Sequence, residues 1–269
     1  AESRSRTVTV GSAPVTVTRS RERDGGRFVT VSCGSLTGRE EDIEALACLL
    51  AGEITELATL LLGRAPDPSL RGLVAGLGND QITPDAVGPR SADHVIATRH
   101  LISRSPEFFA SWHPVSVLAP GVLGQTGVET GEIVRGVLDH VRPRAVIAID
   151  ALAAGRLSRL VRTVQLADTG IVPGSGVNNA RAALDRQTLG VPVVSIGVPT
   201  VADGGSLAHE IAQQLDGAQC EALDDLSQPF IITTRDIDRE VADTARLIGY
   251  AVNMALQHIS VEEIDLYLS

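Results

Sequence analysis

The sequence AVIAID, residues 145–150, decides the fold more than any other stretch of the chain. Its five apolar residues carry no polar alternation and are too few for a buried helix, so they predict a strand that is covered on both faces. Asp150 follows directly, at the carboxyl end of that strand. Ligands of open α/β sheets bind beyond this end, and burying a bare carboxylate is costly. We therefore expect Asp150 to be functional.

The sequence GLGNDQITPDAVGPR, residues 76–90, places a second aspartate in a comparable position. It follows the apolar run 73–75, so Asp85 lies in the loop after another predicted strand. Thr83-Pro84-Asp85 also has the pattern of a helix start, where an aspartate can simply complement the helix dipole. Both interpretations of Asp85 stay open. Two carboxylates on neighbouring loops at one sheet edge are the minimum needed to activate water against an amide.

Strands and helices are expected to alternate along the rest of the chain. The predicted strands are 73–75, 115–118, 145–149, 163–167 and 191–198, and the predicted helices are 87–102, 128–141, 207–215 and 237–256. This rhythm predicts an α/β fold, a three-layer, mostly parallel sheet with helices on both faces. The final helix is expected to pack on the outside.

The first 36 residues have a different pattern. Thr7–Thr18 alternates apolar and polar residues, Arg27–Cys33 does so less strictly, and Asp24-Gly25-Gly26 separates them, which predicts a β-hairpin. We expect residues 1–36 to form a small lobe or an oligomer contact and residues 37–269 to form the α/β domain. A capping-box pattern at 37–40 predicts the start of a helix with apolar residues at helical spacing through Leu61.

Composition excludes several classes of function. The net charge of −10 over 269 residues argues against a nucleic-acid-binding face, and the absence of lysine excludes Schiff-base and P-loop lysine chemistry. Three widely spaced cysteines favour neither a disulfide framework nor a zinc site, which points to the cytosol.

The apolar stretch 45–63 carries Glu53 and Glu56, so no membrane span is expected. No signal peptide is expected at the Ala1 end, and because residue 1 is not methionine we expect a processed chain or an expression product.

Other motifs are weaker. Asp168-Thr169-Gly170 occurs only once, unlike in two-lobed aspartic proteases, but Asp168 also follows a predicted strand and is a candidate for the cleft. Gly174-Ser175-Gly176 has Pro173 where a nucleophile elbow needs glycine, so a serine triad is not favoured. The turns that contain Asn79 and Ser175 are candidates for presenting backbone N–H groups to a substrate.

Two cofactor motifs are incomplete. The His209-Glu210 pair is followed by Gln213 where a zinc motif needs its second histidine, so no metal site is expected there. Gly76 and Gly78 lack the third glycine of a dinucleotide fingerprint. We therefore expect no cofactor.

Several blocks, in the same order, resemble the germination protease family of endospore-forming bacteria. They cover roughly half of the chain, from Gly72 to Asp203, and comprise 76–79, 83–90, 98–101, 119–130, 148–154, 168–171, 173–177 and 196–201. The resemblance implies an atypical aspartic-type endopeptidase that degrades small acid-soluble spore proteins during germination. It also implies a zymogen that loses a short propeptide autocatalytically, a homotetramer, and a fold similar to hydrogenase-maturation peptidases. Its location would be the cytoplasm of the forespore and the spore core, without membrane or direct nucleic-acid binding.

By motif, the family's two essential aspartates fall on Asp85 and Asp150. The chain departs from the family where Val172 replaces a frequent histidine and where Asn178–Arg181 replaces a common Gly-Asn-Lys-Arg. It is also shorter between Gln214 and Ile231, which puts any role of that insertion in question.

The mechanistic hypothesis is a carboxylate pair with split pKa values. Asp85, at a helix N-terminus, is the expected general base, and Asp150 the expected proton donor. Three alternatives remain: a metallopeptidase with the same aspartates as ligands, a non-catalytic paralogue that binds a partner, and, by fold analogy alone, a nucleoside-cleaving or phosphorylase-like enzyme.

Overall fold

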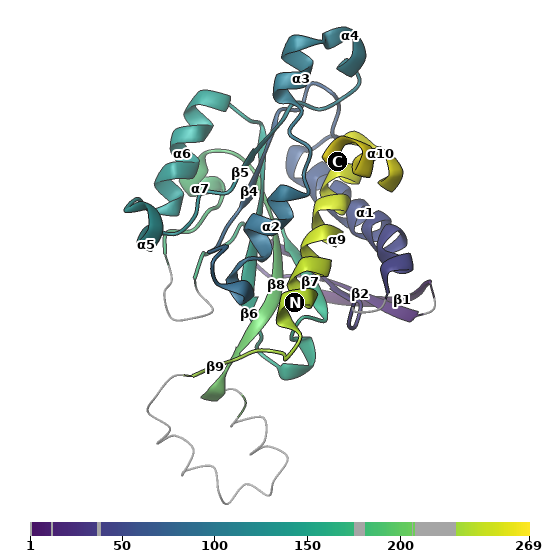
Figure 1. Cartoon of the computed structure of the whole chain (residues 1–269), viewed down its shortest axis with the longest axis vertical. Helices are drawn as coiled ribbons and strands as arrows, with labels where there is room; N and C mark the ends of the chain where they lie inside the picture. The colour runs from purple at the N-terminus through teal and green to yellow at the C-terminus, as the bar shows by residue number, and fades with distance from the viewer. Residues whose placement is uncertain (1, 12, 37–38, 175–180, 206, 208–229) are drawn as a thin grey trace, which may run out of the picture.

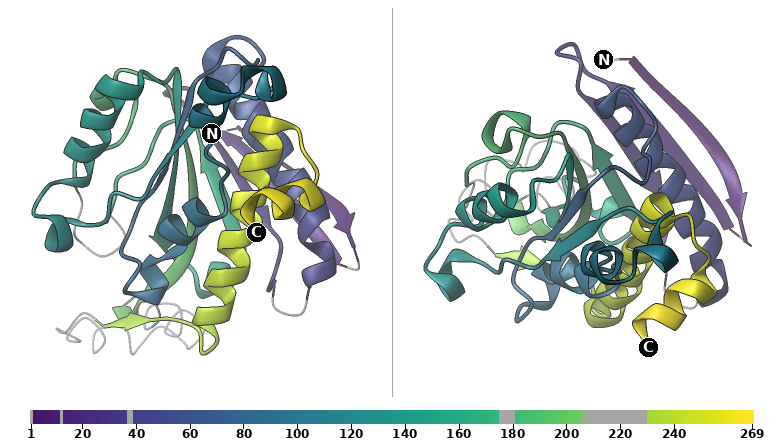
Figure 2. Two further views of the ribbon diagram at one scale, coloured as in Figure 1. Left: turned by 45° about the horizontal axis from the view of Figure 1, so that its top comes forward. Right: turned by 90° about the horizontal axis from the view of Figure 1, so that it is seen from above.

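The computed structural model describes residues 2–11, 13–36, 39–174, 181–205, 207 and 230–269. One sheet runs through the molecule, and helices cover both of its faces (Figure 1, Figure 2). The predicted three-layer α/β architecture is confirmed.

The sheet has the strand order β1-β2-β3-β7-β8-β6-β4-β5, with β9 paired to β8. The four strands β8, β6, β4 and β5 are parallel, and the strands from β8 through β7 and β3 to β1 are antiparallel. The strands are β1 Glu2–Val10, β2 Ala13–Arg21, β3 Arg27–Ser32, β4 Gly72–Gly76, β5 Val115–Leu118, β6 Ala145–Ala153, β7 Thr163–Ala167, β8 Val193–Asp203 and β9 Ile231–Ile232.

The described helices lie in two groups. Helices α1, α2 and α9 cover one face of the sheet and α6 and α7 the other (Figure 1, Figure 2). The helices are α1 Ile43–Leu62, α2 Val87–Asp93, α3 Arg99–Arg104, α4 Pro106–Phe109, α5 Leu123–Thr126, α6 Thr130–Val141, α7 Arg186–Leu189, α9 Ile237–Gln257 and α10 Val261–Leu268, and the 3-10 turns are η1 Glu40–Asp42, η2 Thr83–Asp85 and η3 Leu157–Arg159.

Alternate side chains of the central strands pack into two hydrophobic cores, one on each face of the sheet. Ile147 and Ile149 of β6 belong to the core shared with α1 and α9, whereas Val146 and Ala148 belong to the core shared with α6. This is the pattern expected of a strand buried on both faces, because successive side chains point to opposite sides.

The N-terminal region forms three strands where the sequence predicted two. The run Thr7–Thr18 divides between β1 and β2 at a turn where Gly11 has φ +59°, a conformation that glycine adopts without strain. β3 pairs with β7, so these strands extend the central sheet. A separate lobe over residues 1–36 stays a prediction.

Two helix predictions need correction. The predicted helix 87–102 is interrupted between α2 and α3, where Asn253 of α9 bonds the carbonyl of His94 and the amide of Ile96. Helix α9 does not lie outside; most of it is buried, and its buried residues Asn253 and Gln257 bond neighbouring backbone. The capping residues 37–38 and the predicted helix 207–215 lie largely outside the described residues.

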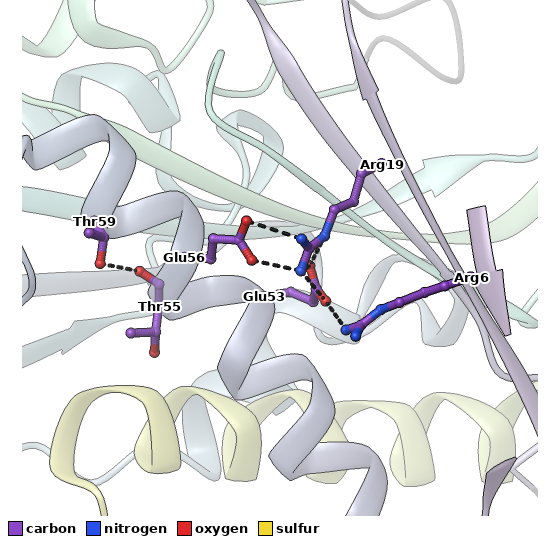
Figure 3. A network of polar contacts seen from close by, with 6 residues as sticks. All are labelled: Arg6, Arg19, Glu53, Thr55, Glu56 and Thr59. Carbon is purple, nitrogen blue, oxygen red and sulfur yellow. Dashed lines mark hydrogen bonds and ion pairs between the residues drawn. The ribbon is translucent and has the colours of Figure 1, made fainter. Parts of the chain in front are cut away.

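Helix α1 carries a buried charge. By length and composition alone, Glu40–Leu62 could cross a membrane, with a mean hydropathy of 1.8. In the structure it packs between the sheet and α9, and the side chain of Glu53 is 2% exposed. Arg19 of β2 and Arg6 of β1 bond this carboxylate, and Arg19 also bonds Glu56 (Figure 3). The described contacts of α1 are those of a core helix.

Candidate active site

The ends of β4 and β6 bring the two predicted loops together. The amide of Leu77 donates to the carbonyl of Ile149 at 2.7 Å, which joins the loop after β4 to β6 beside Asp150. The sequence predicted that this strand ends at Ile149, but β6 continues to Ala153, so Asp150 lies within it. Gly88 of α2 lies against both strands: a Cβ there would be 2.1 Å from the Leu77 oxygen and 2.5 Å from that of Ile149. Only glycine permits this approach, and it sets the turn that carries Asp85 above Asp150.

Asp150 is a buried carboxyl with little compensation. It is 3% exposed, and its Oδ1 accepts a hydrogen bond of 2.9 Å from the amide of Ala151. Burial, with the charge of Asp85 as a second cause, raises the pKa of Asp150 to about 8. A neutral, protonated Asp150 is therefore favoured at neutral pH.

Asp85 is partly exposed and ends the 3-10 turn η2. Its Oδ2 accepts a hydrogen bond of 2.8 Å from the amide of Asn79. Burial raises the pKa of Asp85, and this hydrogen bond opposes the rise. The larger upward shift falls on Asp150, so the environments of the two carboxyls separate them into a better acid and a better base.

Both aspartates line one cavity of about 660 Å³. Its other described walls are mostly apolar, with polar groups near the aspartates, and include Asn79, Ile82, Val122, Leu152, Arg181, Thr200 and Ile231. An apolar cleft with a few convergent polar groups is the usual form of a ligand site.

The other residues that the sequence predicted near the site differ in whether they line the cavity. Asn79 lines the cavity; its amide bonds Asp85, and its Oδ1 accepts hydrogen bonds from Gln81 and Gln125. Ser175 lies outside the described residues, although Pro173 and Gly174 before it line the cavity. Val172, the position at which the sequence was expected to depart from the family pattern, is 36% exposed.

Asp168 does not line the cavity, contrary to expectation. It accepts hydrogen bonds from the amide and the guanidinium of Arg27, at 2.7 and 2.9 Å. Asp168 was a candidate because it follows a predicted strand, but that strand, β7, runs antiparallel to β8. Its carboxyl end therefore lies at the opposite edge of the sheet from Asp150.

Three residues near the site were not identified from the sequence. Thr200 is buried and bonds the turn of Asp85, Gln125 bonds Asn79, and Arg181 bonds both oxygens of Glu129. Thr200 and Gln125 lie in blocks that resemble the family, which was the available signal, whereas the role of Arg181 depends on a contact between distant loops.

The side chains around the cavity would supply the protein ligands of a metal ion bound there. Asp85 and Asp150 supply two carboxylates, and across the described part of the chain no three His, Cys, Asp or Glu side chains gather into a group suited to a metal ion.

Comparison with known proteins gives a consistent result. A model of the germination protease family matches residues 3–217. A germination protease of Caldanaerobacter subterraneus subsp. tengcongensis is 40% identical over 86% of this chain and 78% of that protein. A germination protease of Clostridium acetobutylicum is 35% identical over 91% of this chain and 83% of that protein. One of Bacillus subtilis is 45% identical over 69% of this chain and 50% of that protein.

Among solved structures, a NiFe hydrogenase maturation protease HycI from Thermococcus kodakarensis is 18% identical. The match covers 68% of this chain and 93% of that one, with a TM-score of 0.37. This likeness is too distant to carry a conclusion.

Proposed function

Because the chain belongs to the germination protease family, we propose that it is an endopeptidase that degrades small acid-soluble spore proteins during spore germination. Membership supports a protease. The choice of substrate rests on the resemblance of the sequence blocks to that family. We propose on the same ground that the protein is made as a zymogen, acts in the cytoplasm of the forespore and spore core, and assembles as a homotetramer.

The proposed chemistry is water activation by Asp85 and Asp150. The observation that carries it is that two carboxyls, one from the turn η2 and one from the strand β6, line one cavity and differ in environment. Asp85, the more exposed, takes a proton from the attacking water. Asp150 holds a proton at neutral pH and donates a hydrogen bond to the oxygen of the scissile carbonyl as negative charge develops there.

The test is cleavage of a purified small acid-soluble spore protein by the parent, Asp85→Asn and Asp150→Asn, with and without a chelator. Each substitution removes an acid–base group and should lower kcat on the order of 10²- to 10⁴-fold. Asp139→Asn, an exposed aspartate on α6, is the matched control and should keep the parent rate.

Each alternative predicts a distinct outcome. Loss of activity in both variants with retained folding supports the pair, and loss with chelator alone would favour a metallopeptidase that uses the same aspartates. No cleavage by the parent would favour a binding module or an inactive zymogen. Cleavage that survives both substitutions would move the active site elsewhere.

A further inference from the structure

The turn that carries Asp85 needs support from outside itself. η2 contains only three residues, Thr83–Asp85, and so short a 3-10 segment has few hydrogen bonds of its own. Asn79 bonds the Asp85 carboxylate from within the same loop, and Thr83 bonds Asp238 at the exposed surface. Neither contact ties the turn to the sheet that holds Asp150.

Thr200 of β8 supplies that connection. Its hydroxyl donates to the carbonyl of Pro84 at 2.6 Å, one residue before Asp85, and the residue is fully buried. A buried hydroxyl without a partner would be costly, so this bond favours one position of the turn over others. The carbonyl of Thr200 in turn accepts from the hydroxyl of Thr233, which joins the segment after β9 to the same point.

The pairing of β8 with β6 is irregular at Thr200, the residue that makes this contact. β6 and β8 pair in regular register from Val146 to Leu152, where Leu152 faces Pro199, but the next pair is Ala153 with Val201. Thr200 is thus the extra residue of a β-bulge. Bulges bend a strand and re-aim a side chain, and they are common beside active sites.

We propose that Thr200 is a positioning residue that holds Asp85 opposite Asp150. It acts through the Pro84 carbonyl and touches neither the water nor the scissile bond. The inference rests on the proposed function, because it assigns Thr200 a role only if the two aspartates perform the chemistry. Displacing a catalytic group by about 1 Å can cost on the order of 10²-fold in rate.

The experiment compares Thr200→Val, which keeps the shape and removes the hydroxyl, with Thr200→Ser, which keeps the hydroxyl. Thr163→Val is the matched control, because Thr163 is also buried, lies on β7 and bonds a backbone carbonyl, that of Arg159. Steady-state cleavage of a small acid-soluble spore protein is measured for all three beside Asp85→Asn and Asp150→Asn.

Thr200→Val should lower kcat roughly 10- to 100-fold and leave KM within about 3-fold, since substrate contacts persist while the general base shifts. Thr200→Ser and Thr163→Val should stay within about 3-fold of the parent. If Thr200→Val does not fold, Thr200→Ala against Thr200→Ser isolates the hydroxyl, because both lack the methyl group.

Hydrogen exchange of residues 79–86 without substrate gives a second readout that needs no turnover. Faster exchange in Thr200→Val but not in Thr200→Ser supports the inference. A kcat within about 2-fold of the parent together with unchanged exchange in Thr200→Val would overturn it and leave the proposed function standing. Parent rates in both aspartate variants would instead overturn the catalytic pair and Thr200's role with it.

Discussion

Two buried carboxyl groups, Glu53 in the middle of α1 and Asp150 within the second half of β6, are bonded in opposite ways. Their exposures are nearly equal, 2% and 3%. Glu53 accepts hydrogen bonds from Arg19 at both oxygens, each at 2.8 Å, and a third from Arg6 at 3.1 Å (Figure 3). Within the part of the chain that the structure describes, Asp150 accepts one from the amide of Ala151, and the charged group that acts on it is another carboxylate, Asp85.

The difference shows that burial alone does not mark a functional carboxyl. Glu53 has counter-charges at hydrogen-bonding distance, so its ionised form fits the fold and joins α1 to the N-terminal strands. At Asp150 the surroundings favour the neutral acid, which costs stability at neutral pH and provides a proton donor.

The largest loss of stability is expected from Arg19→Ala. It removes two charge-assisted hydrogen bonds to Glu53 and one to Glu56, and among the described contacts it leaves Glu53 with Arg6 alone. The free energy of unfolding should therefore fall by about 3 kcal/mol, at the low end for a broken buried pair because Arg19 is partly exposed. Urea unfolding measures the change. Arg21→Ala, an exposed arginine on the same strand, is the matched control. Equal losses in the two variants would mean that Glu53 does not need Arg19.

Asp150→Asn should raise the free energy of unfolding, where Arg19→Ala lowers it. The amide removes the ionisable group but can still accept the hydrogen bond from Ala151. Because the pKa of Asp150 is raised from 3.8 to about 8, the carboxyl destabilises the folded parent at neutral pH, and its removal should raise the free energy of unfolding there by on the order of 4 kcal/mol. Urea unfolding beside Asp139→Asn tests this. A variant less stable than the parent at neutral pH would show that Asp150 is compensated as well as Glu53 is.

The stability gap between Asp150→Asn and the parent should depend on pH. Below about pH 4 the carboxyl is protonated in both the folded and the unfolded parent, so the gap is small. As pH rises, the unfolded chain loses this proton first, and the parent loses relative stability by about 1.4 kcal/mol per unit until the folded pKa near 8. Unfolding measured at several pH values gives the slope. A gap that is constant with pH would exclude ionisation as its cause.

The sequence predicted much of the central fold and the aspartate pair, but not the surroundings of either carboxyl. Strands 115–118 and 163–167 coincide with β5 and β7, and Asp85 and Asp150 line one cavity, because apolar runs and the positions after them are local features. The direction of β7 could not be predicted, because pairing depends on distant strands, and Asp168 was therefore expected in the cleft that it does not line. The ion pairs of Glu53 and the contact of Thr200 with Pro84 likewise join residues far apart in the sequence.

The smallest effect is expected from Arg6→Ala. The side chain of Arg6 is 58% exposed, and Arg19 still bonds both oxygens of Glu53 after its removal, so the loss should be below about 1 kcal/mol. In the Arg19→Ala background the same substitution removes the last bonded cation of Glu53 among the described contacts, and its cost should rise above this value. A double-mutant cycle by urea unfolding measures the coupling. Additive losses would contradict a shared role, because two arginines that compensate one buried charge cannot act independently.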